Sequence, residues 1–477
     1  MTLLKQLGVL ATAALLGATP ALCDAARQAP QARQTMLAPT PPMGWNSWDA
    51  YAFTISEGQF KANVRALAAL RRFGWDTAVI DEGWYMANPL GADLAARGYR
   101  YDGYGRLVPD VARFPSARDG KGLSALAAWT HRQGMKFGIH VVRGIPKAAV
   151  EADAPIAGSS FRASLAADKS ATCPWDDANY GVSDNAAGQA YYNSMMRQYA
   201  GWGVDFVKID CISDHPYRPT EIRQVARAIR SAGRPMILSL SPGPTNIAFA
   251  REVKRDSQMW RIMDDLWDSW AFPHPDPNSE FPNGIANAFE RLAQWNSQVG
   301  PGSWPDADML PFGSLTPHPG WGDPRQSRLT QTETRTAFAL WSIARSPLIL
   351  GGNLTQAPAF LRAILTNGQV IALNQGDRVS RPIEAAHAAP GNARLWVSSP
   401  RGAKPDTIAI FNVGETPLQF DRTWSGLGFP AGRWAARDLW TGETTMPSSR
   451  AVVTVAPHDV ALLRLCQTRL ACRGRRH

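Results

Sequence analysis

The sequence predicts an α/β protein: a (β/α)8 barrel followed by a C-terminal antiparallel β-sandwich domain. From Met43 to Asn353, short apolar runs alternate with helix-like segments, as in a parallel sheet with helical crossovers. Polar residues recur at the C-terminal ends of these runs, the rim at which barrel active sites form. After about Val379 the pattern changes to short alternating strands separated by Gly, Pro and Asp turns.

Eight runs are the expected barrel strands: 43–48, 77–84, 137–142, 206–210, 236–241, 259–265, 303–310 and 347–353. Helical patterns between several of them cover 56–73, 122–133, 188–202, 219–232 and 331–344. Expected strands of the second domain are 407–412, 420–424, 433–440 and 452–465. We therefore expect the barrel at residues 38–378 and the β domain at 379–470.

The first 25 residues have the pattern of a secretory signal peptide: Lys5, an apolar run over 7–16, then small residues around Pro20. The run is too short to span a bilayer, and no other segment approaches the length of a membrane helix. The residues before Cys23 do not form a lipoprotein signal, so we expect no lipid anchor. The sequence thus predicts a secreted or periplasmic protein in which disulfides are permitted.

Four cysteines follow the signal peptide. Cys466 and Cys472 are close in sequence, and their pairing would staple the tail. A Cys173–Cys211 bond would tie the long loop 150–181, which has no clear internal structure and is typical of a lid, to the residue beside Asp210. Both pairings are hypotheses. No spacing resembles a zinc site, and we expect no metal and no cofactor.

Composition narrows the class of partner. The net charge is +10, but Lys and Arg are dispersed rather than arranged in a basic stripe with aromatics, which argues against a nucleic-acid partner. The chain has 18 Trp against 10 Tyr. Flat indoles suit sugar rings, although they also fill large cores.

Lys208 and Asp210 are charged residues at the C-terminal end of an otherwise apolar strand. Two positions apart in a strand, they point to the same face. A lysine beside an aspartate keeps the carboxylate ionised, as a nucleophile requires. A buried ion pair without chemistry explains the pattern equally well at this point.

A second acidic stretch, 260–270, contains three Asp and three Trp, with Arg261 near its start. Carboxylates from two strands at one rim could face each other across the barrel mouth. Glycoside hydrolysis needs such a pair, one as nucleophile and one as acid/base. Other barrel enzymes also use paired acids.

Several motifs in one order resemble glycoside hydrolase family 27, the family of α-galactosidases and α-N-acetylgalactosaminidases. The resemblance extends from about Pro41 to Leu465. It rests on Pro42-Met43-Gly44-Trp45-Asn46-Ser47-Trp48, Asp81-Glu82-Gly83-Trp84, Lys208-Ile209-Asp210-Cys211 and the stretch from Trp260-Arg261 to Asp265.

The resemblance implies roles for individual residues. Asp210 matches the nucleophile, and Asp265, rather than Asp264, matches the acid/base. Strand alternation would place Asp265 on the face of Arg261, with Asp264 opposite. Positions that match sugar contacts are Lys208 and Arg261 at the hydroxyls, Trp48 as aromatic platform, and Asp81 with Glu82 at the far side of the ring. For Asp264, Asp268, Asp306 and Asp308 we expect turn, capping or supporting roles.

Three departures from the family pattern fall in the sugar pocket. Glu82 stands where the family commonly has Asp, and its extra methylene would disfavour a hydroxymethyl group at C6, as in β-L-arabinopyranose. His140 replaces a common Tyr. The segment 238–243 replaces the loop that reads the 2-position, leaving Ser241 as a candidate contact.

The expected function is that of a retaining α-galactosidase that hydrolyses terminal α-D-galactosyl residues. Alternatives within the family are β-L-arabinopyranosidase, α-N-acetylgalactosaminidase and enzymes acting on glucose polymers. The alternative from a different class is a non-catalytic carbohydrate-binding protein.

Overall fold

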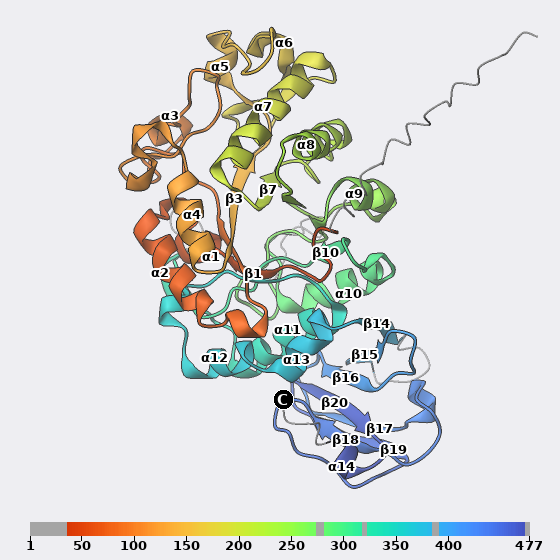
Figure 1. The fold of residues 1–477 in the computed structure, drawn as a ribbon. Coiled ribbons are helices and arrows are strands. Elements are labelled where there is room, and N and C mark those ends of the chain that lie inside the picture. Colours follow the sequence, from red (N-terminus) through yellow and green to blue (C-terminus); the bar gives the residue numbers. More distant parts are fainter. Residues whose placement is uncertain (1–35, 273–280, 317–321, 384–390, 473–477) are drawn as a thin grey trace, which may run out of the picture. The chain divides into compact units, whose positions relative to one another are not determined.

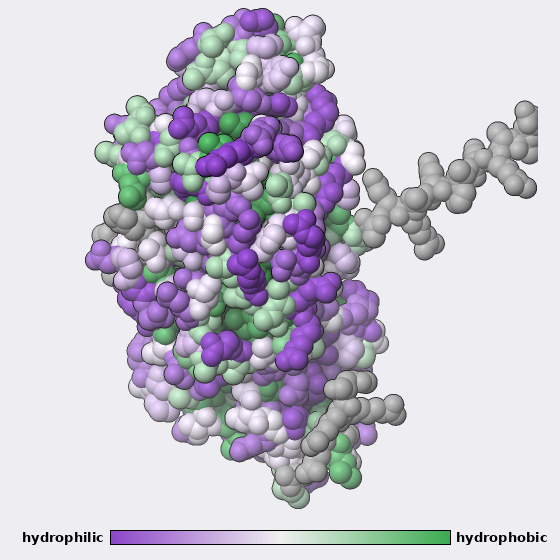
Figure 2. Space-filling view, turned by 60° about the vertical axis from the view of Figure 1, so that its left-hand side comes forward, coloured by the Kyte–Doolittle hydropathy of each residue, from purple (hydrophilic) through white to green (hydrophobic). Residues whose placement is uncertain are grey.

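The structure is a computed structural model that describes residues 36–272, 281–316, 322–383 and 391–472. The predicted signal peptide, residues 1–25, lies outside the described residues. None of the helices in these ranges is both long and apolar enough to cross a membrane. Hydrophilic and hydrophobic residues are interspersed on the face drawn in Figure 2.

Eight parallel strands form the barrel, in the order β10-β9-β8-β7-β3-β2-β1-β13 (Figure 1). An isolated parallel bridge between Leu310 and Leu350 joins the segment after β10 to β13 and brings the ends of the sheet together. The predicted (β/α)8 class is confirmed, although most strands are shorter than expected. They are β1 (Met43–Asn46), β2 (Thr77–Ile80), β3 (Lys136–Val142), β7 (Phe206–Asp210), β8 (Ile237–Leu240), β9 (Met259–Arg261), β10 (Trp304–Asp306) and β13 (Leu348–Leu350).

Helices lie outside the strands (Figure 1), and local capping signals set several of their ends. Ser56 and Gln59 form a capping box at the start of α2, and Thr330 and Glu333 form one at α11. The sequence did not predict α10, although its apolar side chains recur with helical spacing. The main helices are α2 (Glu57–Ala68), α4 (Ser124–Arg132), α7 (Ala186–Trp202), α8 (Pro219–Ser231), α9 (Ala250–Asp256), α10 (Ile285–Trp295), α11 (Gln331–Ala344), α12 (Ala359–Leu365) and α13 (Gly368–Gln375).

The segment 150–181 is not the unstructured loop that the sequence predicts. It belongs to a three-stranded antiparallel sheet of order β4-β6-β5, which includes a register shift between Asp168 and Thr172. Polar residues on both faces of β5 hide the alternation by which a strand is recognised. Its elements are β4 (Ile145–Pro146), α5 (Lys147–Glu151), α6 (Ala163–Ala166), β5 (Ala167–Thr172) and β6 (Asn179–Val182).

The C-terminal domain has a five-stranded sheet, β14-β15-β16-β20-β18, and a two-stranded sheet, β17-β19. The single strand predicted over 452–465 is two strands, because the chain turns at Pro457 and at His458, which has a φ of 54°. The strands are β14 (Arg378–Ile383), β15 (Ala393–Pro400), β16 (Thr407–Asn412), β17 (Leu418–Thr423), β18 (Ala435–Asp438), β19 (Arg450–Val455) and β20 (Val460–Cys466).

His458 joins the β domain to the barrel. Its ring nitrogens lie 2.8 Å from Glu333 Oε1, at the start of α11, and 3.0 Å from Glu415 Oε1. The imidazole stacks on Trp270, with ring centroids 4.1 Å apart. Beside it, Arg335 on α11 donates to both carboxylate oxygens of Asp459. The β domain therefore contacts the segment that follows β9.

Asp268 anchors that same segment. Its side chain is 0% exposed and accepts hydrogen bonds from the guanidinium groups of Arg325 and Arg328. Burial alone would raise its pKa, but these hydrogen bonds outweigh burial and lower the pKa to about 2. This buried position, paired with two arginines, fits a structural role for Asp268 better than a catalytic one.

We expect Asp268→Asn to lower the free energy of unfolding at pH 7 by about 3 kcal/mol, because it leaves two arginines without their buried partner. Since the folded-state pKa is depressed, the stabilisation is present above about pH 4 and is lost as the pH falls toward about 2. Urea denaturation between pH 7 and pH 3 measures this. Asp421→Asn, at an exposed ion pair with Arg450, is the matched control and should cost less than about 1 kcal/mol. A pH-independent loss for Asp268→Asn would contradict this account.

Candidate active site

A cavity of about 420 Å³ opens at the C-terminal ends of the barrel strands. Eight of the nine predicted catalytic and sugar-binding residues line it: Trp48, Asp81, Glu82, His140, Lys208, Asp210, Ser241 and Asp265. The ninth, Arg261, lies beside it and is fully buried. The C-terminal ends of the barrel strands therefore bring together residues that are far apart in sequence.

Lys208 of β7 bonds to Asp81, which follows β2, and only β3 lies between these two strands. Lys208 and Asp210 are the two half-buried positions of β7, whose other residues are buried. Lys208 Nζ donates to Asp81 Oδ2 at 3.0 Å, and Asn46 Nδ2 donates to the same oxygen at 2.6 Å. Burial alone would raise the pKa of Asp81, but His140, Lys208 and these hydrogen bonds lower it well below its usual range. Asp81 is therefore an ionised acceptor.

Asp210 has two hydrogen-bond donors. Its Oδ2 lies 3.5 Å from His140 Nε2, and its Oδ1 accepts from the backbone N–H of Cys211 at 2.8 Å. Burial opposes its charge, but the hydrogen bond from His140 and the charge of Lys208 lower its pKa below the usual value. Asp210 is thus an ionised carboxylate facing the cavity.

Asp265 stands beyond the end of β9. Arg261 Nη2 donates to Asp265 Oδ1 at 3.1 Å, and Arg261 Nη1 lies 2.8 Å from Asp308 Oδ1. Because β9 ends at Arg261, strand alternation does not extend to the two acids, and Asp264 lines the cavity together with Asp265. The expectation that Asp264 points to the opposite face is therefore wrong. Burial and the neighbouring Asp265 raise the pKa of Asp264 to about 7.

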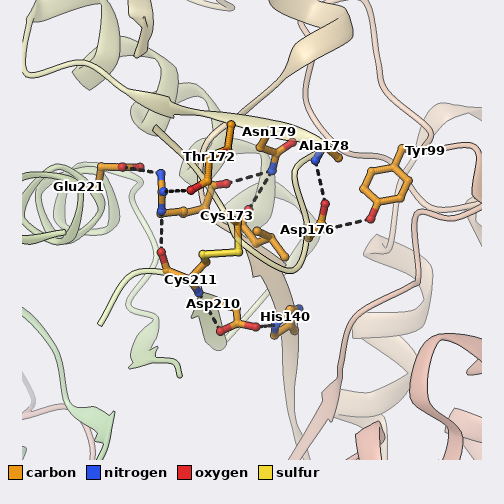
Figure 3. The surroundings of a disulfide bond; sticks show 12 residues. Tyr99, His140, Thr172, Cys173, Asp176, Ala178, Asn179, Asp210, Cys211 and Glu221 are labelled. Atoms are coloured by element: carbon orange, nitrogen blue, oxygen red, sulfur yellow. Dashed lines mark hydrogen bonds and ion pairs between the residues drawn. A yellow bond between two sulfur atoms is a disulfide. The ribbon is translucent and has the colours of Figure 1, made fainter. Parts of the chain in front are cut away.

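Glu82 shares a hydrogen bond with an acid of the 150–181 segment. Its side chain bonds to Asp176. Asp176 Oδ2 accepts from the Tyr99 hydroxyl at 2.8 Å, and its Oδ1 accepts from Ala178 N at 3.0 Å (Figure 3). Burial, Asp176, Asp210 and Asp81 raise the pKa of Glu82 well above its usual value. The protonated form of Glu82 is favoured, and it can donate to Asp176.

A disulfide between Cys173 and Cys211 fixes this segment to the end of β7 (Figure 3). Arg143 reinforces the junction by donating to Cys211 O at 2.6 Å, to Thr172 O at 3.1 Å and to Glu221 Oε1 at 2.8 Å. A second disulfide joins Cys466 and Cys472. Both hypothesised pairings thus occur in the structure.

Other residues around the cavity were not predicted as site residues: Phe53, Arg97, Trp175, Asp176, His215, Pro242, Asp264, Phe281 and Met309. Trp175, 44% exposed, was visible in the sequence as an aromatic residue in an acidic connecting segment. Asp264 stood in the acidic stretch 260–270 and Pro242 in the segment 238–243, whereas the remaining residues come from connections whose course over the barrel mouth has no local sequence signal.

Glu82, His140 and Asp210 offer three ligand atoms within 4.8 Å of one another, a geometry that could also suit a metal ion. The positive charge of Lys208 lowers the pKa of Asp210, and Lys208 Nζ lies 3.0 Å from Asp81 Oδ2. A cation already beside these carboxylates disfavours a second one. The chemistry expected of paired carboxyls needs no metal.

Two family models match this chain. Residues 177–376 match the model described as alpha galactosidase A, and residues 391–465 match the alpha galactosidase C-terminal beta sandwich domain. A crystal structure of a family 27 β-L-arabinopyranosidase from Geobacillus stearothermophilus, in complex with arabinose, has 37% sequence identity and a TM-score of 0.83. The match covers 90% of this chain and 98% of that one. This chain belongs to glycoside hydrolase family 27.

Curated relatives within family 27 show more than one specificity. Alpha-galactosidase A of Cellvibrio japonicus is 26% identical over 457 residues, which is 92% of this chain and 95% of that protein. Alpha-N-acetylgalactosaminidase of Gallus gallus is also 26% identical, over 90% of this chain and 94% of that protein. The family establishes a glycoside hydrolase, and these relatives leave several sugars to be distinguished.

We expect replacement of both Cys173 and Cys211 by Ala to reduce the free energy of unfolding by about 4 kcal/mol, because the bond closes a loop of 38 residues. The control, with both Cys466 and Cys472 replaced by Ala, should lose about 2 kcal/mol, since its loop spans 6 residues. Chemical denaturation measures both, and mass mapping without reductant checks the pairings. Equal losses, or four free thiols in the wild type, would contradict this expectation.

Proposed function

We propose that this family 27 enzyme is a retaining exo-glycosidase whose nucleophile is Asp210 and whose acid/base is Asp265. The supporting observation is that both carboxyl groups line one cavity and that each is contacted by different charged side chains. Asp210 is kept ionised by His140 and Lys208. Asp265 is oriented by Arg261, which belongs to a different strand, β9.

The proposed reaction is a double displacement. The Asp210 carboxylate attacks the anomeric carbon, and Asp265 donates its proton to the departing glycosidic oxygen. This gives a glycosyl ester on Asp210 and a free alcohol. Asp265, now a carboxylate, takes a proton from water as the water attacks the anomeric carbon, which releases the sugar with its configuration retained.

Other residues of the cavity would bind the sugar. Lys208 and Arg261 supply cationic donors for hydroxyl groups, and the ionised Asp81 accepts from them. Trp48, which packs edge to face on Phe53 at 5.0 Å, provides an aromatic surface. His140 and Ser241 are further polar groups of the cavity wall.

We infer that Glu82 makes β-L-arabinopyranose the better-fitting sugar. This ring matches α-D-galactose except that it lacks the hydroxymethyl arm at C6. Glu82 is 6% exposed, and a carboxyl oxygen of it lies within 4.8 Å of ligand atoms of His140 and Asp210. The side chain is about 1.5 Å longer than an aspartate, and its bond to Asp176 prevents it from retracting. The arabinose-bound family 27 structure at 37% identity supports the same choice.

An α-D-galactoside is the second candidate substrate, and it is the one that the sequence motifs favour. The family-model descriptions and the curated relatives support it. Both candidates have the same ring stereochemistry from C1 to C4, so the proposed mechanism holds for either.

We also propose that the chain is exported. Two disulfides are typical of proteins from oxidising compartments, and this agrees with the signal peptide predicted for residues 1–25.

Asp210→Ala and Asp265→Ala should each reduce kcat/KM by several orders of magnitude on glycosides with poor leaving groups. With a 2,4-dinitrophenyl leaving group Asp265→Ala should recover most of the first step, because departure no longer requires a proton. Azide should then raise its turnover. Asp210→Ala should recover hydrolysis with neither change, and azide should give it only a glycosyl azide of inverted configuration. Steady-state kinetics, with NMR of the first anomer released, measures these effects.

Asp264→Asn is the discriminating variant for this assignment. If Asp264→Asn, and not Asp265→Ala, shows the leaving-group dependence and azide rescue, the acid/base is Asp264. Wild-type protein that binds the glycosides but releases no sugar would favour a carbohydrate-binding protein instead.

A panel of p-nitrophenyl glycosides tests the substrate. We expect the β-L-arabinopyranoside to exceed the α-D-galactoside in kcat/KM by about tenfold or more, and Glu82→Asp to reverse the order, since one methylene changes discrimination by roughly 10–200-fold. The α-N-acetylgalactosaminide and the α-D-glucoside complete the panel. A wild-type preference for the α-D-galactoside that Glu82→Asp leaves unchanged would disprove the role of Glu82.

The hydrogen bond from Glu82 to Asp176 gives a second variant. Asp176→Asn removes a negative charge that raises the pKa of Glu82, so the pKa of Glu82 should fall and the preference should weaken. Asp177→Asn is the matched control. Asp177 is the next residue in the chain, and its exposed side chain pairs with Lys147 instead of Glu82. Equal effects of the two substitutions would show that the charge of the turn, rather than the bond to Glu82, matters.

A further inference from the structure

A second cavity, of about 740 Å³, lies where α12 and α13 meet β18 and β20. It shares no lining residue with the cavity at the barrel mouth. Its wall includes Arg437 of β18, Arg464 of β20, Trp440 after β18, and the first residues of α13. The proposed hydrolysis uses none of these groups.

The two arginines form a like-charge pair. Arg437 and Arg464 are direct partners in the antiparallel register of β18 and β20. Like charges directly opposite each other destabilise a sheet. Arg437 donates only to neutral acceptors, the side chain of Gln369 at 3.4 Å and Gly442 O at 2.5 Å, in the described part of the chain.

Arg464 is the less satisfied of the two. Its Nε is buried and has no hydrogen-bond partner within the described ranges. The negative charge of Asp406 raises the pKa of Arg464, but Asp406 already forms an ion pair with Arg378. Burial outweighs this charge and lowers the pKa of Arg464 below the usual arginine value. A half-buried guanidinium that shares its neighbouring carboxylate with Arg378 is only partly compensated, so an anionic ligand would be stabilising here.

Two further features favour an anion with an apolar body. Trp440 Nε1 is also buried without a partner among the residues described. The cavity is much larger than an inorganic ion requires and falls in the range of small-molecule sites.

We propose that this cavity binds the carboxylate of an acidic sugar. The guanidinium groups of Arg437 and Arg464 donate to the carboxylate oxygens, and the indole of Trp440 lies beside the sugar ring. The site is separate from catalysis and would hold an acidic polysaccharide on the enzyme while its neutral terminal sugars are cleaved elsewhere.

Isothermal titration of the full chain with D-glucuronate, D-glucose and sodium sulfate tests this proposal. Glucuronate differs from the galactose series at C4, so it is a poor ligand for the proposed active site. We expect saturable glucuronate binding, no glucose binding, and about tenfold or greater weakening in Arg464→Gln and in Arg437→Gln. Arg132→Gln, an equal charge change on an exposed residue of α4, should bind as the wild type does. Trp440→Leu should weaken glucuronate binding and leave sulfate binding unchanged.

Folding of the variants is checked by thermal unfolding and by hydrolytic activity, which all four should retain. Absence of saturable glucuronate binding, or equal binding by Arg464→Gln and the wild type, would overturn the proposal. Sulfate binding as tight as that of glucuronate, with no effect of Trp440→Leu, would show a bare anion site and overturn the sugar assignment.

Discussion

The barrel mouth concentrates carboxyl groups around two buried cations, and the site depends on this balance. Lys208 bonds to Asp81 and acts on Asp210, while Arg261 contacts Asp265 and Asp308. Lys208 and nearby hydrogen-bond donors lower the pKa of Asp81 and of Asp210, whereas burial and neighbouring acids raise the pKa of Glu82. One cluster of similar side chains thereby contains carboxyls whose pKa values are shifted in opposite directions, as acid–base chemistry requires.

The sequence predicted much of this site because the barrel has a simple rule. Asp81 and Ser241 follow two strands and Asp210 is the last residue of a third, and parallel strands bring their C-terminal ends to one rim. Lys208 and Asp210 were recognisable because charge in an apolar strand is costly. The family resemblance added Asp265, which lies four residues beyond β9 and has no periodicity of its own.

The features that the sequence did not predict depend on contacts between distant segments. No residue near Glu82 in the sequence indicates a contact with Asp176. That contact depends on the position of the β5–β6 connection, which the Cys173–Cys211 bond fixes to the end of β7. The predicted direction of the Asp264 side chain was wrong, because the strand alternation on which it rested ends at Arg261, the last residue of β9. Irregular backbone obeys no period, so its side-chain directions require the folded structure.

The stacking of His458 on Trp270 has a consequence for how the molecule evolves and can be engineered. Trp270 belongs to the same segment as Asp265, so the β domain supports one wall of the catalytic barrel. Phe289 of α10 packs on Phe411 of β16 at 5.1 Å, and one apolar core continues across this boundary. The β domain is therefore no interchangeable module: a chimera that exchanged it would have to reproduce the seam, and a barrel expressed alone would expose aromatic surface and aggregate.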